Sequence, residues 1–196
     1  SISVNAFGGI DILVANAGFA SAALFEKTSS KLCDKNMDIL SKGCFLISRE
    51  VYQKMIDQKN GGSIIFVSSK NSLNASKGAS AYSVAKSSLL HLSRSIALEG
   101  SSHKIRSNVV NPDAVIQNSK IWQGEWTKQR AISNKISVNQ VEEFYKNRSL
   151  LKVSILPEDI AEGIYFFASS KSKKSTGNII NVDGGNITSF LSLIHI

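Results

Sequence analysis

Short apolar segments alternate with longer helical patterns along this 196-residue chain, and this alternation limits the folds that it can adopt. Segments 10–15, 63–68, 105–110 and 177–182 have the length and apolar content of buried strands. Helical patterns cover 30–57, 79–99 and 157–168, the last opening with proline and two acidic residues. Strands that are apolar on both faces belong to parallel sheets covered by helices on both sides. We therefore predict a single α/β domain with a doubly wound parallel sheet.

Composition restricts the partners. The net charge is +8, but the lysines are scattered and are not interleaved with aromatic residues, which disfavours nucleic-acid binding. The alternative, a basic binding module, predicts a salt-sensitive affinity for nucleic acid. Apolar runs are too short to span a membrane, and the first residues do not resemble a secretory signal. Cys33 and Cys44 lack metal-ligand spacing, so we expect free thiols, no metal and a cytoplasmic location.

Residues 113–156 differ from the rest of the chain because they are polar, aromatic and poorly periodic. A connection of this length inside a compact domain is usually functional, and we predict a lid that contains helices, for example near 140–148. Its aromatic residues are Trp122, Trp126, Phe144 and Tyr145. Lys120, Lys128 and Arg130 of this segment could meet an anionic substrate, although solvated surface positions are the favoured interpretation.

Two features carry possible chemistry. Asn16-Ala17-Gly18 follows the first predicted strand, and a turn of small residues there lets a ligand approach the backbone. Tyr82 and Lys86 lie four residues apart on a predicted helix and therefore share one face. A nearby ammonium lowers the pKa of a tyrosine, which would make Tyr82 a general acid or base near neutral pH. Each feature alone also occurs by chance on ordinary turns and helix surfaces.

Ser69 is a third candidate site residue. Ser69 ends the second predicted strand, thirteen residues before Tyr82, and Ser68 beside it is the alternative. Ligands bind at the carboxyl ends of strands in such sheets, so a hydroxyl there could polarise a substrate carbonyl. The order Asn-Ala-Gly, then Ser-(12 residues)-Tyr-(3 residues)-Lys, resembles the short-chain dehydrogenase/reductase family. The segments Asn108-Val109-Val110-Asn111-Pro112 and Val182-Asp183-Gly184-Gly185 add to the resemblance.

The resemblance implies a Rossmann-type fold, a nicotinamide cofactor and hydride transfer to or from a carbonyl carbon. Tyr82 would be the acid/base, Lys86 would hold the nicotinamide ribose, and Ser69 would orient the substrate oxygen. Asn16, Ala17 and Gly18 would lie along the cofactor, and Pro112 and Val115 would lie near its nicotinamide. It also implies dimers or tetramers that pack through the helices at 30–57 and 79–99.

A narrower resemblance points to the dehydrogenase half of bifunctional rhamnulose-1-phosphate aldolase/alcohol dehydrogenases. It rests on Ser68-Ser69-Lys70-Asn71-Ser72, Pro112-Asp113-Ala114-Val115, Ile121-Trp122-Gln123-Gly124-Glu125-Trp126 and Phe166-Phe167-Ala168-Ser169-Ser170. It implies oxidation of lactaldehyde with NAD in rhamnose catabolism, downstream of an N-terminal aldolase domain. A general short-chain dehydrogenase acting on a sugar, a polyol or another carbonyl compound is the alternative.

The chain departs from the family pattern in its length. The family's glycine-rich Thr-Gly-x-x-x-Gly-x-Gly turn is absent, as is the residue that separates NAD from NADP users. We therefore expect a domain that lacks its first strands and helices, spans residues 1–190, and exposes an apolar sheet edge. Residues 191–196 resemble an artefactual tail. The second hypothesis follows: this chain alone is inactive and binds NAD poorly.

Single positions depart as well. Leu40 occupies the family's asparagine position on the long helix, and a leucine cannot hold the water of the usual proton relay. Asn36, one turn earlier, is a weak substitute. Asp113 replaces a glycine after Pro112, and it is either a site residue near the nicotinamide or a solvent-facing loop acid.

Overall fold

The computed structural model describes residues 2–186, and the tail expected at 191–196 lies outside these residues. Its centre is a four-stranded sheet in the order β1-β2-β3-β4, and every pair of neighbours is parallel. The strands are β1 (Ile12–Ala15), β2 (Gly62–Val67), β3 (Ile105–Pro112) and β4 (Ile179–Val182). The predicted parallel α/β fold is therefore confirmed, with strand ends displaced by up to two residues.

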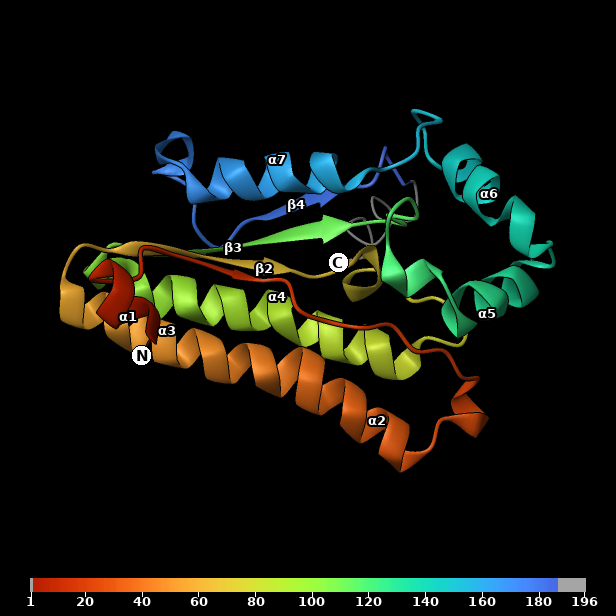
Figure 1. Ribbon diagram of the computed structural model, residues 1–196, viewed down its shortest axis with the longest axis horizontal. Coiled ribbons are helices and arrows are strands. Elements are labelled where there is room, and N and C mark those ends of the chain that lie inside the picture. The colour runs from red at the N-terminus through yellow and green to blue at the C-terminus, as the bar shows by residue number, and fades with distance from the viewer. Residues whose placement is uncertain (1, 187–196) are drawn as a thin grey trace.

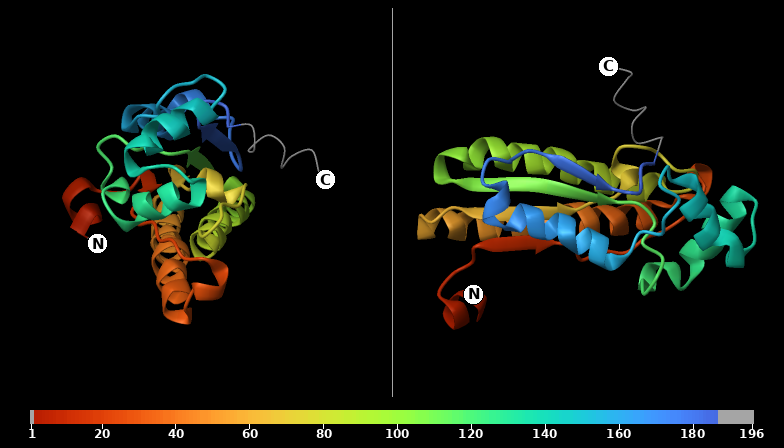
Figure 2. Two further views of the ribbon diagram at one scale, coloured as in Figure 1. Left: turned by 90° about the vertical axis from the view of Figure 1, so that its right-hand side faces the viewer. Right: turned by 90° about the horizontal axis from the view of Figure 1, so that it is seen from above.

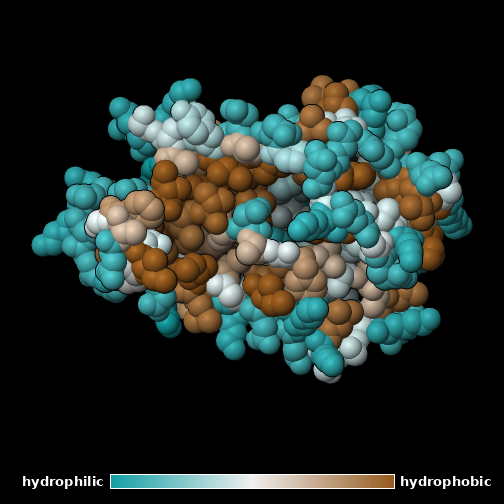
Figure 3. Space-filling view, viewed as in Figure 1, coloured by the Kyte–Doolittle hydropathy of each residue, from teal (hydrophilic) through white to brown (hydrophobic). Residues whose placement is uncertain are grey.

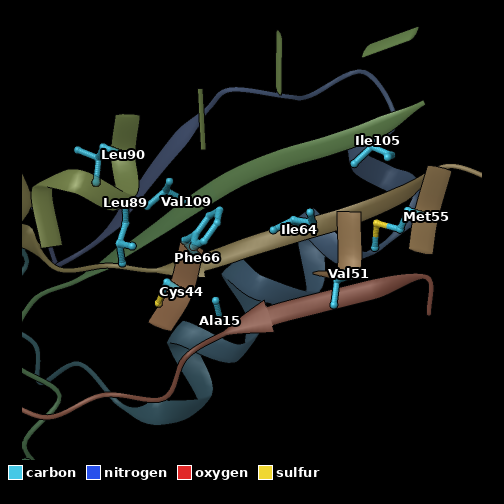
Figure 4. Packing of buried hydrophobic residues seen from close by; sticks show 10 residues of the cluster. All are labelled: Ala15, Cys44, Val51, Met55, Ile64, Phe66, Leu89, Leu90, Ile105 and Val109. Atoms are coloured by element: carbon cyan, nitrogen blue, oxygen red, sulfur yellow. The ribbon is translucent and has the colours of Figure 1, made fainter. Parts of the chain in front are cut away.

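Helices cover the sheet on both sides, as Figure 1 shows. The helices of the described residues are α1 (Ile2–Phe7), α2 (Ser30–Asn36), α3 (Gly43–Gln58), α4 (Ser80–Gly100), α5 (Glu125–Asn134), α6 (Val141–Arg148) and α7 (Pro157–Ala168). Of these, α3 and α4 cover one face of the sheet and α7 covers the other. Alternate residues of β2 point to opposite sides, because side chains alternate along a strand. Ile64 and Phe66 enter a core with α3 and α4, drawn in Figure 4. Ile65 and Val67 enter a second core with α7.

The long helix predicted over 30–57 is present, but it is not uniform. Residues Met37–Lys42 between α2 and α3 form a π-helical segment, and the helix continues to Gln58. π-Helical turns are rare and often mark functional sites. Leu40 lies in this segment, is fully buried, and contacts Tyr82 and Ala85 of α4.

The predicted lid contains more regular structure than the sequence indicates. It holds a 3-10 turn at Lys120–Trp122, α5, a 3-10 turn at Val138–Gln140, and α6. The helix expected near 140–148 is confirmed as α6, and α5 is a further helix whose position the sequence did not indicate. Figures 1 and 2 place α5 and α6 together beyond the carboxyl ends of the strands. The segment therefore lies where ligands bind in parallel sheets.

The face of β1 remains partly open. Ile12 and Val14 are 48% and 39% exposed, although β2 beside them is buried on both faces. Hydrophobic side chains gather between α7 and α3 in Figure 3. The expected exposure of an apolar sheet edge is thus present at β1. Within residues 2–186, no helix is both long enough and apolar enough to cross a membrane.

Candidate active site

A cleft of about 700 Å³ opens at the carboxyl ends of β1, β2 and β3. The loops after these strands form one wall, and α4, α7 and the lid segment supply the rest. Every candidate site residue predicted from the sequence lines it: Asn16, Ala17, Gly18, Ser69, Tyr82, Lys86, Pro112 and Val115. Residues separated by up to about half the chain therefore meet in one hollow.

Tyr82 and Lys86 reach the cleft from the same face of α4, and both are buried. The Tyr82 ring lies 5.6 Å from the ring of Trp126 in the lid, at a tilt of 52°. The Ser69 side chain lies close enough to the Tyr82 hydroxyl to lower its pKa. We call Gly18, Ser69, Tyr82 and Lys86 the Tyr82 cluster. It joins the ends of two strands to one helix beneath an aromatic ring of the lid.

The electrostatics of Tyr82 differ from the sequence-based expectation. Burial raises the pKa of Tyr82, and only the interaction with Ser69 opposes this shift. The expected lowering by Lys86 is absent. The Lys86 ammonium instead donates to the Val67 carbonyl at 2.8 Å. Tyr82 is therefore a neutral phenol near pH 7 in this structure, and its hydroxyl carries a proton that it can donate.

Lys86 is held in place at the floor of the cleft. Burial lowers its pKa to about 8, and interaction with Cys44 opposes this shift. A Cβ built on Gly18 would lie 3.9 Å from Lys86 Nζ and 3.1 Å from Leu40 Cδ2. The glycine therefore lets the backbone after β1 come close to the ammonium group, and a larger residue would crowd this approach.

The geometry favours Ser69 over Ser68 as the site hydroxyl. Ser68 Oγ donates to the Lys86 carbonyl at 2.9 Å, so this hydroxyl links α4 to the end of β2 and its proton is already used. Ser69 Oγ accepts from the backbone N–H of Asn71 at 3.2 Å, which begins the turn Lys70–Ser72. Its hydroxyl proton is left for Tyr82 or for a ligand.

Asn36 does not enter the site. Its side-chain amide donates to Ser21 Oγ at 2.8 Å and to the Leu32 carbonyl at 2.7 Å, and the residue is fully buried. Leu40 lies nearer, against Tyr82, but it brings only methyl groups. The polar group that the family places on this helix therefore has no counterpart at either position.

A second group of residues was largely missed from the sequence. Lys70, Asp113 and Arg130 line the same cleft, and Arg148 pairs with Asp113. Asp113 also accepts from Asn186 Nδ2 at 2.8 Å, and its side chain is only 9% exposed, so it is no solvent-facing loop acid. Arg130 is 3% exposed, which corrects the expectation of a solvated position. We call these four residues the charged cluster.

The residues present fit the nicotinamide and ribose half of a dinucleotide. The open backbone at Gly18, the anchored ammonium of Lys86 and the strand-end segment Pro112–Val115 surround a hollow that is large enough for it. The chain has no glycine-rich turn that would cradle a pyrophosphate. Residues 2–186 also contain no group of three or more His, Cys, Asp or Glu side chains placed to bind a metal ion.

The comparisons with known proteins agree with this architecture. Residues 2–186 match the family model described as enoyl-(acyl carrier protein) reductase. The uncharacterized oxidoreductase YuxG of Bacillus subtilis is 52% identical over 92% of this chain, which spans only 26% of that protein. An uncharacterized oxidoreductase of Thermotoga maritima is 37% identical over 94% of this chain and 70% of its own length.

Solved structures give the same result. The sorbitol-6-phosphate 2-dehydrogenase SrlD of Erwinia amylovora superposes with a TM-score of 0.89 at 30% identity. The match covers 94% of this chain and 72% of that one. With the parallel sheet and the family model, these relatives identify the chain as a member of the short-chain dehydrogenase/reductase family of oxidoreductases.

Proposed function

We propose that this chain carries the catalytic part of an NAD(P)-dependent dehydrogenase that interconverts a small alcohol and its carbonyl compound. One observation carries the proposal: Ser69, Tyr82 and Lys86 line one cleft, and the cleft also contains the open backbone at Gly18. A bound nicotinamide would supply or accept the hydride. The protein groups then have to orient the substrate oxygen and move one proton.

Each residue has a distinct role in this proposal. Ser69 donates a hydrogen bond to the substrate oxygen, and Tyr82 transfers the proton to or from that oxygen. Lys86 is the positioning residue for the cofactor ribose, since two of its three ammonium protons are not used by Val67. Asn16, Ala17, Pro112 and Val115 all line the cleft and would lie along the cofactor. The relay beyond Tyr82 takes a route that does not use Leu40.

The proposed cofactor is NAD, with NADP as the alternative. Since the chain has no glycine-rich turn, we propose that the 196 residues alone bind NAD weakly and do not turn over. Calorimetric titration of the purified chain with NAD tests this directly. Saturable binding in the micromolar range would contradict it.

For the substrate we propose lactaldehyde in rhamnose catabolism, because of the resemblance carried by the lid tryptophans. Its hydrate, formed by addition of water, would be the alcohol that gives up the hydride and a proton, and lactate would be the product. The 26% share of the Bacillus relative leaves room in that protein for another domain, which is consistent with an N-terminal aldolase in such proteins. The second candidate is a sugar or polyol. It is supported by the structural neighbour described as a sorbitol-6-phosphate 2-dehydrogenase.

For the assembly we propose a cytoplasmic homodimer or homotetramer that packs through α3 and α4. Phe45 and Ile47 of α3 and Val84 and Leu98 of α4 are each at least 46% exposed. Apolar groups in such number on two helices support an interface between copies of the chain. Sedimentation of the protein measures the assembly.

The function is tested with the longest natural protein that contains this chain. NAD reduction is followed with L-lactaldehyde, propane-1,2-diol, sorbitol and sorbitol 6-phosphate, in the wild type and in Tyr82→Phe. We expect turnover of at least one of these compounds and its loss in the variant. Turnover of none by a folded, NAD-binding protein would contradict the proposed substrates, and turnover unaffected by Tyr82→Phe would contradict the proposed chemistry.

A further inference from the structure

Lys70 is a buried cation with one neutral partner. It follows Ser69 directly, it is 7% exposed, and its Nζ donates to Ser76 Oγ at 3.1 Å. Ser76 in turn donates to Asn71 Oδ1 at 2.8 Å, so its hydroxyl proton is already used. Among residues 2–186, no carboxylate forms an ion pair with this ammonium, which has three protons to donate.

Arg130 lies in the same situation on the lid side of the cleft. Its guanidinium stacks over the ring of Trp126 at 4.6 Å, and Nη2 donates to the Lys77 carbonyl at 2.7 Å. Its Nε is buried and has no hydrogen-bond partner, and no carboxylate within the described residues pairs with it. Lysine and arginine are rarely buried to this degree without a partner of opposite charge.

Asp113 and Asp183 act electrostatically on Lys70, but within residues 2–186 neither forms an ion pair with Lys70 or Arg130. The cleft is lined by three cations, Lys70, Lys86 and Arg130, and by one carboxylate, Asp113. Asp113 is already held by Arg148 and Asn186. Removing unpaired charge from water is costly, and a charge-assisted hydrogen bond from an anion would offset this cost.

We propose that Lys70 and Arg130 form an anion subsite, so that the substrate carries a phosphate or carboxylate group in addition to its reacting hydroxyl or carbonyl. The inference rests on the proposed dehydrogenase function and deepens it. Of the two substrate candidates proposed above, it favours the second, a sugar or polyol, in phosphorylated form. A hydroxy acid also meets it, whereas neutral lactaldehyde does not. The subsite belongs to the same cleft as Tyr82, and Lys70 is the direct neighbour of Ser69 in the chain.

The chain contains its own reporter for this subsite. Its two tryptophans, Trp122 and Trp126, both line the cleft, so their fluorescence responds to a ligand without any cofactor. The purified chain is titrated with two matched pairs of probes, sorbitol 6-phosphate against sorbitol and L-lactate against propane-1,2-diol. We expect a saturable change with at least one charged member, at an affinity about tenfold or more above that of its neutral counterpart. The pair that responds identifies phosphate or carboxylate.

Variants locate the response. Lys70→Gln and Arg130→Gln should each lower the affinity for the charged probe about tenfold. Lys128→Gln is the matched control, because it makes the same charge change on α5, two residues before Arg130, at a side chain that is 67% exposed. Lys70→Arg keeps the charge and should retain most of the affinity. Circular dichroism establishes that each variant is folded.

Several outcomes would overturn the subsite: equal affinity for charged and neutral probes, no saturable response to either anion, or equal weakening by Lys128→Gln. Failure of the dehydrogenase proposal looks different. Binding of the anion to a chain whose full-length protein oxidises none of the alcohols would leave the subsite standing and contradict the proposed function. Turnover of an alcohol without any preference for anionic substrates would support the proposed function and contradict the subsite.

Discussion

Two buried lysines line one cleft in this protein, and their surroundings differ. Lys86 belongs to the Tyr82 cluster, where its ammonium donates to a strand carbonyl, and Cys44 is the titratable group that influences it. Lys70 belongs to the charged cluster, where Arg130 and Arg148 and two acids act on it. Burial lowers both pKa values to about 8. The Lys86 ammonium is thus anchored to the backbone of β2, whereas the Lys70 ammonium has one hydroxyl partner and can still bind an anion.

The difference separates chemistry from recognition. The Tyr82 cluster is built from strand ends and one long helix, which hold groups rigidly enough for proton transfer. The charged cluster joins the turn after β2 to the lid, where α5 and α6 bring in arginines from distant segments. We infer that the first cluster sets the reaction and the second selects the substrate.

The largest expected effect on activity is at Lys86. Lys86→Met removes the ammonium beside Gly18 and its bond to Val67, so kcat in the longest natural protein should fall about 100-fold or more. Lys42→Met, at an exposed lysine of the same chain, is the control and should leave kcat unchanged. Equal rates in Lys86→Met and wild type would remove Lys86 from the site.

The ion pair of the charged cluster comes next. Arg148→Met leaves the nearly buried carboxylate of Asp113 with only Asn186, and the free energy of unfolding should fall by about 2 kcal/mol. Adding Asp113→Asn to this variant removes the unpaired carboxylate charge and should restore part of the lost free energy of unfolding. Urea unfolding of the wild type and the two variants measures both effects. A single variant as stable as wild type would mean that the pair does not support the lid.

Anion affinity should also depend on pH. Lys70 is charged below its pKa of about 8 and neutral above it, so binding weakens as pH rises through this value. Between pH 7 and pH 9 we expect a loss of about tenfold, since the charge of a phosphate ester changes little over this range. Asp113 and Asp183 raise the pKa of Lys70, whereas Arg130 and Arg148 lower it. Fluorescence titrations at both pH values check this, and Lys70→Arg should flatten the dependence.

The smallest effect is at Gly18. In Gly18→Ala the new methyl group would lie 3.1 Å from Leu40 Cδ2, and this crowding should weaken NAD binding about fivefold in the longest natural protein. Leu40→Val made in the same protein gives the methyl group room and should recover part of the affinity. An unchanged dissociation constant in Gly18→Ala would show that the backbone here does not approach the cofactor.

The Tyr82 cluster could be predicted from the sequence because its signals are local. Two residues four apart on a helix share a face, and a serine at a strand end faces the ligand side of a parallel sheet. The electrostatics could not be predicted in the same way. The pKa of Tyr82 depends on burial, and Lys86 turned to a carbonyl of β2 that lies nineteen residues away in the chain.

The charged cluster illustrates what local patterns miss. Arg130 is buried because Trp126, one turn earlier, stacks on it and because Lys77, from a loop 53 residues away, accepts its hydrogen bond. Asp113 and Arg148 lie 35 residues apart. α5 itself shows little apolar periodicity, so neither its position nor the side that it buries was evident from the sequence. Such contacts form only when the lid folds against the sheet.

One kinetic comparison tests the division between chemistry and recognition most directly. Tyr82→Phe and Lys70→Gln are made in the longest natural protein, and kcat and KM are measured with the charged compound that binds best in the fluorescence titration. Tyr82→Phe should lower kcat by about 100-fold or more with little change in KM. Lys70→Gln should raise KM about tenfold and leave kcat within about twofold. Loss of kcat in both variants alike, or full kcat in Tyr82→Phe, would contradict the account.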